Sequence, residues 1–287
     1  MNNSLMVGYL QSWSSNVTFT QAAESGYNAI VLAFGEIDGS NIGIYDGFFA
    51  ASHTPELLKE DISNAKRKGA KQILLSVGGA NNTYNPGKTP SNELAKNIVS
   101  FLNEYGFTGI DFDLEIDGDG EYLDELCQAL KNVEPSLVIT AAPQLNQGAH
   151  ETDLILVSAG NCRMYDQAVR NNRFDYLFIQ AYNNQWPVIN DTNETDVEFI
   201  SNSFTNLTKN IPTETKIAIG EPADRQAAGT SIFTAPDVPN NIYQLIHDQY
   251  ETICANPQFG GAMVWSINLD AQNEYKFVNA LKGLLNS

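Results

Sequence analysis

Short apolar segments alternate with amphipathic segments along the whole chain. Apolar, β-branched runs predict eight strands, at residues 5–10, 28–34, 72–77, 108–114, 137–142, 176–182, 216–220 and 261–266. Apolar positions at helical spacing predict helices between them, at residues 55–69, 91–106, 121–133, 197–210 and 240–256, and a last helix closes the chain. Nearly continuous apolar strands that alternate with helices are typical of a parallel sheet covered on both faces.

Eight such units predict a closed (β/α)8 barrel, the TIM barrel, with residues 1–287 as a single domain. An open, doubly wound sheet is the alternative. No GxGxxG follows the first strand, which weakens a dinucleotide-binding version of that alternative. Segments rich in Asn, Gly and Pro follow several strands, and in a barrel these are the loops of the C-terminal face, where active sites lie.

Composition excludes several classes of partner. The formal net charge is −18, and an acidic surface repels nucleic acid and anionic membranes. No apolar run approaches the roughly 20 residues that span a bilayer. The three cysteines form no CxxC pair and the three histidines are scattered, so we expect no metal ion and no cofactor. The N-terminus shows no basic segment of a secretion signal, which leaves an intracellular protein, a mature chain or another export route.

The segment GFTGIDFDLEIDGDG carries acids where a core strand is predicted. Asp111, Asp113 and Glu115 stand at every second position, so their side chains point the same way, about 6.6 Å per step. The apolar residues between them point toward the helices. The acids therefore climb inside the barrel toward its mouth, with Glu115 nearest the substrate. Because close like charges do not all ionise freely, we expect one carboxyl to have a raised pKa and to hold a proton near neutral pH, as a general acid must.

Two other interpretations of these acids are weaker. A calcium loop is suggested by DLEIDGDGE, with Gly118 at the sharp turn. A strand rather than a helix leads into it, however, and Asp124 rather than Glu stands at the last position. A structural ion-pair cluster would need cationic partners, and the chain has only 16 Lys plus Arg, none of them within this strand.

TGIDFDLE (108–115) resembles the DGxDxDxE signature of glycoside hydrolase family 18, the chitinase family. The resemblance extends in order along nearly the whole chain, through AFGEI (33–37), LLSVGG (74–79), TAAPQ (140–144), QAYNN (180–184), GEPA (220–223) and GGAMVWSIN (260–268). Thr108 replaces the first Asp of the signature. Glu221 stands where related bacterial chains often have Leu, and we expect it to add an acid at the mouth of the barrel.

The resemblance implies retaining, substrate-assisted cleavage of β-1,4-linked N-acetylglucosamine polymers. Glu115 would donate the proton to the glycosidic oxygen. The acetamido oxygen of the substrate, rather than a protein group, would attack the anomeric carbon. Asp113 would orient the acetamido group and share a proton or hydrogen bond with Asp111 while the substrate is absent. Tyr182 would donate its hydroxyl to the acetamido carbonyl.

The resemblance also implies a set of substrate contacts. The residues at family positions are Gln180, Asn183, Trp265, Tyr9, Phe34 and Gln144. For Trp265 and Tyr9 core packing is the competing interpretation, and for Asn183 it is capping of a loop. Three loop aromatics, Trp13, Tyr84 and Trp186, are further candidates to extend the groove.

Some family members carry an α+β domain between the last two strands, and we expect none here. This predicts a shallow, open groove and internal cleavage of the polymer. The expected partner is chitin or chito-oligosaccharides, bound by a monomer that is secreted. Two alternatives stay open: an endo-β-N-acetylglucosaminidase that acts on N-glycans, and a non-catalytic chitin-binding lectin. A lectin would usually lack the acid, and Glu115 is present.

Overall fold

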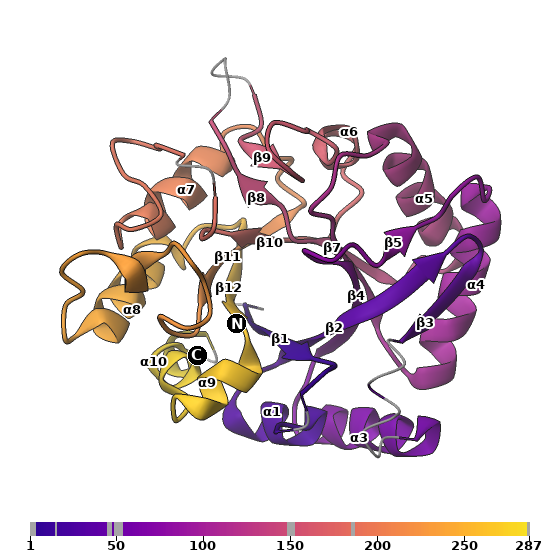
Figure 1. The fold of residues 1–287 in the computed structure, drawn as a ribbon, viewed down its shortest axis with the longest axis horizontal. Coiled ribbons are helices and arrows are strands. Elements are labelled where there is room, and N and C mark those ends of the chain that lie inside the picture. The colour runs from indigo at the N-terminus through magenta and orange to yellow at the C-terminus, as the bar shows by residue number, and fades with distance from the viewer. Residues whose placement is uncertain are drawn as a thin grey trace.

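The computed structural model describes residues 4–14, 16–44, 48, 54–147, 153–184 and 187–285. Eight parallel strands form a closed ring, which Figure 1 shows from one end. In ring order the strands are β1 (Leu5–Gln11), β2 (Ala29–Asp38), β4 (Gln72–Gly78), β6 (Gly109–Asp113), β7 (Val138–Ala141), β10 (Tyr176–Gln180), β11 (Lys216–Pro222) and β12 (Phe259–Trp265). β12 pairs with β1 and β10 pairs with β11, so no edge is left open. The predicted barrel is confirmed.

Helices surround this ring (Figure 1). They are α1 (Phe19–Ser25), α3 (Pro55–Arg67), α4 (Ser91–Tyr105), α5 (Gly120–Val133), α6 (Asp166–Arg170), α7 (Phe199–Leu207), α8 (Ile242–Ile253), α9 (Ile267–Gln272) and α10 (Lys276–Leu285). The sequence analysis missed α1, α6 and α9 because none has more than seven residues, too few to show a period. A capping box of Thr18 and Gln21 was the available signal for α1. In the described ranges no helix is both long and apolar enough to cross a bilayer.

The barrel interior is filled by a separate apolar cluster. Val7, Val31, Leu74, Phe178 and Met263 point inward and are fully buried. The alternate residues of the same strands point outward and join the larger cluster beneath the helices. Period-two alternation therefore divides one apolar strand between two cores, and it closes the barrel below its mouth.

Short additional strands extend the sheet around the mouth. β3 (Asn41–Ile44) pairs antiparallel with β2, and β5 (Tyr84–Asn85) pairs with the end of β2. On the side of β7 and β10, β8 (Gln144–Leu145) pairs with β10 and with β9 (Leu156–Val157). β2 consequently ends four residues later than predicted, because β3 and β5 continue its hydrogen bonding past Phe34.

The connection from β11 to β12 contains little regular secondary structure. Residues 223–258 are all described, and the only regular elements in them are a 3-10 helix, η1 (Ile232–Thr234), and α8. No inserted α+β domain lies in this interval, as predicted. The mouth therefore has no additional wall on this side.

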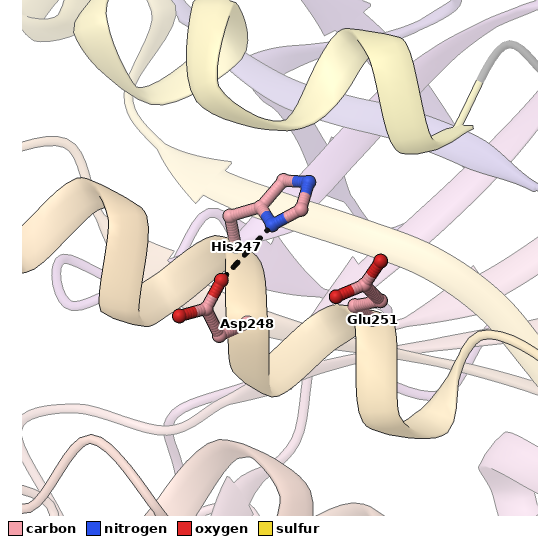
Figure 2. Close-up of side chains that lie close together, drawn as sticks. All are labelled: His247, Asp248 and Glu251. Atoms are coloured by element: carbon pink, nitrogen blue, oxygen red, sulfur yellow. Dashed lines mark hydrogen bonds and ion pairs between the residues drawn. The ribbon is translucent and has the colours of Figure 1, made fainter.

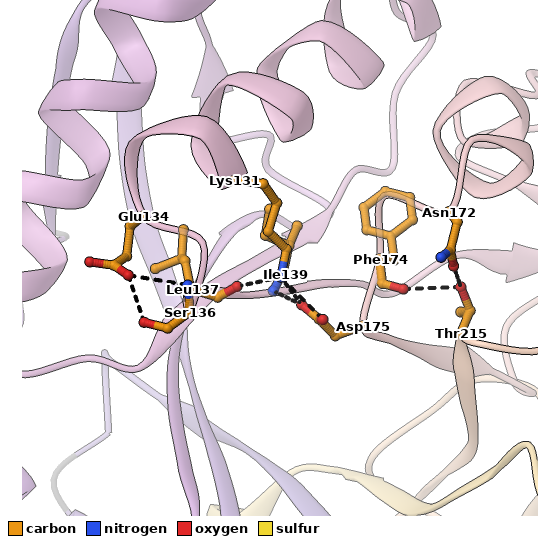
Figure 3. A network of polar contacts seen from close by, with 9 residues as sticks. All are labelled: Lys131, Glu134, Ser136, Leu137, Ile139, Asn172, Phe174, Asp175 and Thr215. Atoms are coloured by element: carbon orange, nitrogen blue, oxygen red, sulfur yellow. Dashed lines mark hydrogen bonds and ion pairs between the residues drawn. The ribbon is translucent and has the colours of Figure 1, made fainter.

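A polar network ties the outer helix α5 to the strand connections between β7 and β11 (Figure 3). Lys131 Nζ donates to the carbonyl of Leu137 at 2.7 Å and pairs with Asp175 Oδ2 at 2.8 Å. Thr215 Oγ1 donates to the carbonyl of Phe174 at 3.0 Å. These contacts precede β7, β10 and β11 in the chain, so they lie at the N-terminal ends of the strands. Polar residues at that end of a barrel contribute to stability rather than to a site.

Candidate active site

The acids of β6 lie in a row of increasing exposure. Asp111 is fully buried, Asp113 is 5% exposed, and Glu115 follows the strand and is partly exposed. Ile110, the outward neighbour, packs in the core beneath the helices. The predicted climb from the interior to the mouth is therefore present, and Glu115 is the acid of the row that solvent reaches most easily.

Three hydroxyl groups hold the deepest acid. Asp111 Oδ2 accepts from Tyr9 Oη at 2.9 Å and from Ser76 Oγ at 2.7 Å, and its Oδ1 accepts from Thr140 Oγ1 at 2.5 Å. Burial raises the pKa of Asp111, and the three donors oppose that rise. The expected hydrogen bond from Asp111 to Asp113 is not formed. Hydroxyls from β1, β4 and the β7 strand occupy the oxygens of Asp111 instead.

Asp113 is held by an amide. Gln180 Nε2 donates to Asp113 Oδ1 at 2.9 Å and also to the carbonyl of Ala142 at 2.9 Å. Burial, followed by the charges of Glu115 and Asp111, raises the pKa of Asp113 well above its ordinary range. Burial also raises the pKa of Glu115. The pKa is raised at all three acids rather than at one, and the rise is strongest at Asp113.

Tyr182 stands two residues beyond Gln180 and faces the same groove. Burial and the charges of Asp113 and Glu115 raise its pKa well above the ordinary range, so its hydroxyl stays protonated. No described residue accepts a hydrogen bond from this hydroxyl, although the hydroxyl of Tyr9 is paired. Tyr182 is therefore a free donor beside two carboxyl groups.

A groove of about 900 Å³ opens above these residues. It is lined by nine of the residues that the sequence analysis singled out: Asp113, Glu115, Tyr182, Gln180, Asn183, Trp265, Phe34, Gln144 and Trp13. Asp111 and Tyr9 do not line it. Both lie beneath the groove, and Tyr9, only 2% exposed, supports Asp111 from the barrel interior.

Three aromatic rings cluster at one side of the groove. The ring centroids of Phe34 and Trp265 are 6.3 Å apart at 22°, and those of Trp13 and Phe34 are 6.2 Å apart at 25°. Trp13 is 54% exposed, which makes it the rim of the cluster. Of the other loop aromatics, Tyr84 is buried against Phe112, and Trp186 lies outside the described residues. Stacked apolar faces of this kind suit the flat face of a sugar ring.

Two glycines let β4 approach these groups closely. A Cβ at Gly78 would lie 2.1 Å from the carbonyl oxygen of Asp113, and one at Gly79 would lie 2.5 Å from the Phe34 ring. Both glycines also have positive φ, +116° and +68°. The backbone N–H of Gly79 donates to the Asp113 carbonyl at 2.6 Å. The two glycines of the SVGG motif are therefore required because a side chain would not fit there and because their φ angles are positive.

Sequence reasoning missed one wall of the groove. Glu36 and Asp38 line it from the end of β2, Asn81 and Asn82 line it from the loop after β4, and Asn85 lines it from β5. The acids were missed because β2 was predicted to end at residue 34. The asparagines had a signal, since ANNTYN is one of the polar segments that follow strands.

Asn183 combines two of the roles considered for it. It lines the groove, and its φ of +54° places it in the left-handed region. Its Oδ1 accepts from the backbone N–H groups of Gly229 at 2.8 Å and Thr230 at 3.0 Å. The carbonyl end of the side chain therefore caps the loop after β11.

The expectation for Glu221 was wrong. Glu221 is fully buried and is not among the residues that line the groove. Strand alternation explains the error: residue 221 shares the outward face of β11 with Ile217 and Ile219, so its side chain lies under the helices. Among the described residues, neither of its carboxyl oxygens has a hydrogen-bond partner.

The other acids of the segment are used elsewhere. Asp119 caps α5 by accepting from the backbone N–H of Tyr122 at 3.2 Å, and Asp124 pairs with Arg173 at 2.7 Å. Within the described ranges, no Lys or Arg forms an ion pair with Asp111, Asp113 or Glu115. These contacts argue against both the calcium loop and the ion-pair cluster.

One further group of possible metal ligands lies away from the groove. His247, Asp248 and Glu251 are close together on α8 (Figure 2), and their ligand atoms are within 4.8 Å of one another. His247 Nδ1 is 3.3 Å from Asp248 Oδ1. None of the three lines the groove, so this group takes no part in the site.

Comparison with known proteins agrees with this geometry. Residues 5–228 match the profile of Glycosyl hydrolases family 18, and the chain belongs to that family. An acidic endochitinase of Cucumis sativus is 28% identical over 270 residues, which cover 89% of this chain and 78% of that protein. An acidic endochitinase of Cicer arietinum is 28% identical over 281 residues, which cover 93% of this chain and 82% of that protein. The crystal structure of a family GH18 chitinase from Chromobacterium violaceum has a TM-score of 0.77 at 21% identity, covering 99% of this chain and 84% of that one.

Proposed function

We propose that this chain is a chitinase that hydrolyses β-1,4 linkages between N-acetylglucosamine units with retention of configuration. One observation carries the proposal. Partly exposed Glu115 stands above Asp113, which Gln180 holds in place, and the hydroxyl of Tyr182, which has no acceptor among the described residues, lies beside them in an aromatic groove. A general acid, an oriented anion and a neutral donor are the three groups that acetamido-assisted cleavage needs.

In the first step Glu115 gives its proton to the glycosidic oxygen as the bond from that oxygen to the anomeric carbon breaks. The acetamido oxygen of the same sugar forms the new bond to that carbon, which yields a cyclic oxazolinium ion. The positive charge that forms on the sugar favours the ionised form of Asp113, which accepts a hydrogen bond from the acetamido N–H and offsets that charge. The Tyr182 hydroxyl donates to the acetamido oxygen and orients it. Burial of both carboxyl groups strengthens these interactions because the local dielectric is low.

In the second step water attacks the anomeric carbon from the face that the leaving group vacated. Glu115, now a carboxylate, takes a proton from this water and so returns to its starting state. The oxazolinium ring opens as its bond to the anomeric carbon breaks. Two displacements at one carbon leave its configuration unchanged.

The groove favours a neutral, extended ligand. Trp265, Phe34 and Trp13 offer apolar faces, and Gln144 and Asn183 offer polar groups beside them. Because no inserted domain walls the side between β11 and β12, a long polymer can lie across the mouth with both ends free. These features support internal cleavage of chitin or of soluble chito-oligosaccharides.

The test is the product pattern from N-acetylglucosamine hexamer, followed by chromatography and by NMR of the anomeric proton. The wild type is expected to release products of several sizes with retained configuration, and Glu115→Gln is expected to release almost none. Stepwise release of dimers alone would contradict internal cleavage. Binding of the hexamer without cleavage would indicate a lectin, and cleavage of an N-glycan in its place would indicate the other enzymatic alternative.

A further inference from the structure

The last residue of QAYNN has no place in the mechanism above. Asn184 is only 6% exposed and does not line the groove. Its Oδ1 accepts from the backbone N–H of Leu145 at 2.9 Å, and its Nδ2 donates to the carbonyl of Gln180 at 3.1 Å. One side chain therefore joins the segment that carries Gln144 to the strand end that carries Gln180.

A buried carboxyl group holds Asn184 in turn. Glu194, in the loop between β10 and α7, is fully buried, and its Oε2 accepts from the backbone N–H of Asn184 at 2.6 Å. Its Oε1 has no hydrogen-bond partner in the part of the chain that the structure describes, and burial raises the pKa of Glu194 to about 7. Burial, followed by the charge of Glu194, raises the pKa of Glu221 on β11, which is also fully buried. Keeping a carboxyl group here is costly for stability, which calls for a compensating role.

We propose that Glu194 is a positioning residue that, through Asn184, holds Gln180 against Asp113. The contacts form an unbroken series. Glu194 Oε2 accepts from the N–H of Asn184, Asn184 Nδ2 donates to the Gln180 carbonyl, and Gln180 Nε2 donates to Asp113 Oδ1 at 2.9 Å. Since Asp113 orients the acetamido group, this inference rests on the proposed function. Glu194 touches no substrate and acts only on geometry.

The series predicts an effect on kcat rather than on KM. When Glu194 or Asn184 is replaced, the side chain of Gln180 would shift relative to Asp113. The aromatic groups that bind the sugar would stay in place. Misplacement of a catalytic group by about 1 Å can lower the rate roughly 100-fold. A role confined to the stability of the loop would instead change the melting temperature and leave kcat as it is.

The experiment measures kcat and KM on N-acetylglucosamine hexamer, with melting curves, for Glu194→Ala, Glu194→Gln and Asn184→Ala. Glu194→Gln keeps a carbonyl oxygen that can accept from Asn184, so it is expected to stay within about 3-fold of the wild type. Glu194→Ala and Asn184→Ala are expected to lower kcat at least about 10-fold with KM little changed. The double variant with Glu194→Ala and Asn184→Ala is expected to have a kcat no lower than that of the weaker single variant, because both residues act in one series.

Glu221→Gln is the matched control, since Glu221 is equally buried but forms no hydrogen bond to residues 180–184. It is expected to leave kcat unchanged. An equal loss in Glu221→Gln, an equal loss in Glu194→Gln and Glu194→Ala, or strictly additive single effects would each overturn the proposal.

Failure of the proposed function can be distinguished from failure of this inference. If the wild type cleaves none of the substrates, a crystal structure of Glu194→Ala decides the inference instead. Loss of the contact between Gln180 Nε2 and Asp113 Oδ1 supports it. Retention of that contact refutes it.

Discussion

The hydroxyl of Tyr9 lies 2.9 Å from Oδ2 of Asp111, although 102 residues separate them in the chain. This contact joins β1 to β6 across the barrel interior. With Ser76 and Thr140, Tyr9 supplies the hydrogen bonds that a fully buried carboxyl group requires. Asp111 is thereby fixed below Asp113, where its charge contributes to the raised pKa of Asp113.

Replacement of Tyr9 by Phe removes one of these donors. We expect a loss of about 1–2 kcal/mol in the free energy of unfolding, because Asp111 stays buried with a less satisfied oxygen. Urea unfolding at pH 7 measures the loss. Tyr105→Phe is the control, since that tyrosine is only partly buried at the surface of α4. A similar loss in both variants would contradict the assignment.

Glu115→Gln tests the general acid. We expect kcat/KM on N-acetylglucosamine hexamer to fall by at least about 100-fold, the usual contribution of a positioned acid. In the wild type the acid must be protonated, and burial raises its pKa. Activity should therefore be lost as the pH rises through this raised pKa. Rates measured between pH 4 and pH 9 check this loss of activity at alkaline pH. Glu121→Gln, which changes an exposed residue of α5, is the control and should show the same pH dependence as the wild type.

The buried pair Glu194 and Glu221 predicts a pH dependence of stability. Both have raised pKa values in the folded state, that of Glu194 rising from an ordinary 4.5 to about 7. A raised acid pKa means that the folded protein binds more protons than the unfolded chain. The contribution of Glu194 is then fully present below pH 4.5 and is lost as the pH rises toward 7.

Glu221→Gln removes one of these ionisations and keeps the shape. We expect it to raise the free energy of unfolding at pH 8 by ~1–3 kcal/mol, with a smaller gain at pH 5. Denaturant unfolding at the two pH values measures the difference. Glu198→Gln, an exposed glutamate of the same region, should show neither gain. A gain that does not change with pH would show that ionisation is not the cause.

Trp13→Ala tests the rim of the aromatic cluster. Removal of one stacking face is expected to weaken binding of the hexamer by about 1 kcal/mol, or roughly 5-fold in KM, with kcat nearly unchanged. The expectation follows because Trp13 is 54% exposed and offers the groove an aromatic face but no acidic or basic group. Leu57→Ala removes another exposed apolar side chain outside the groove and should change nothing. A fall in kcat alone would place Trp13 nearer the reacting bond.

Much of this protein is determined locally along the chain. Eight apolar runs and their helices suffice to predict the barrel, because each strand is buried on both faces and each helix on one. The spacing of Asp111, Asp113 and Glu115 is equally local, since strand alternation alone turns all three inward. Part of the groove could be predicted for the same reason, because the lining residues that were named in advance follow or end recognisable strands.

Only the tertiary structure decided which groups satisfy these residues. Asp111 takes hydroxyls from three other strands instead of a bond to Asp113, and Tyr9 supports that acid from below the groove. Glu194 accepts a hydrogen bond from the N–H of Asn184, and it does so from a loop that has no periodic pattern. Strand direction and alternation are properties of the chain itself, whereas the partners of a buried polar group depend on which segments the closed barrel brings together.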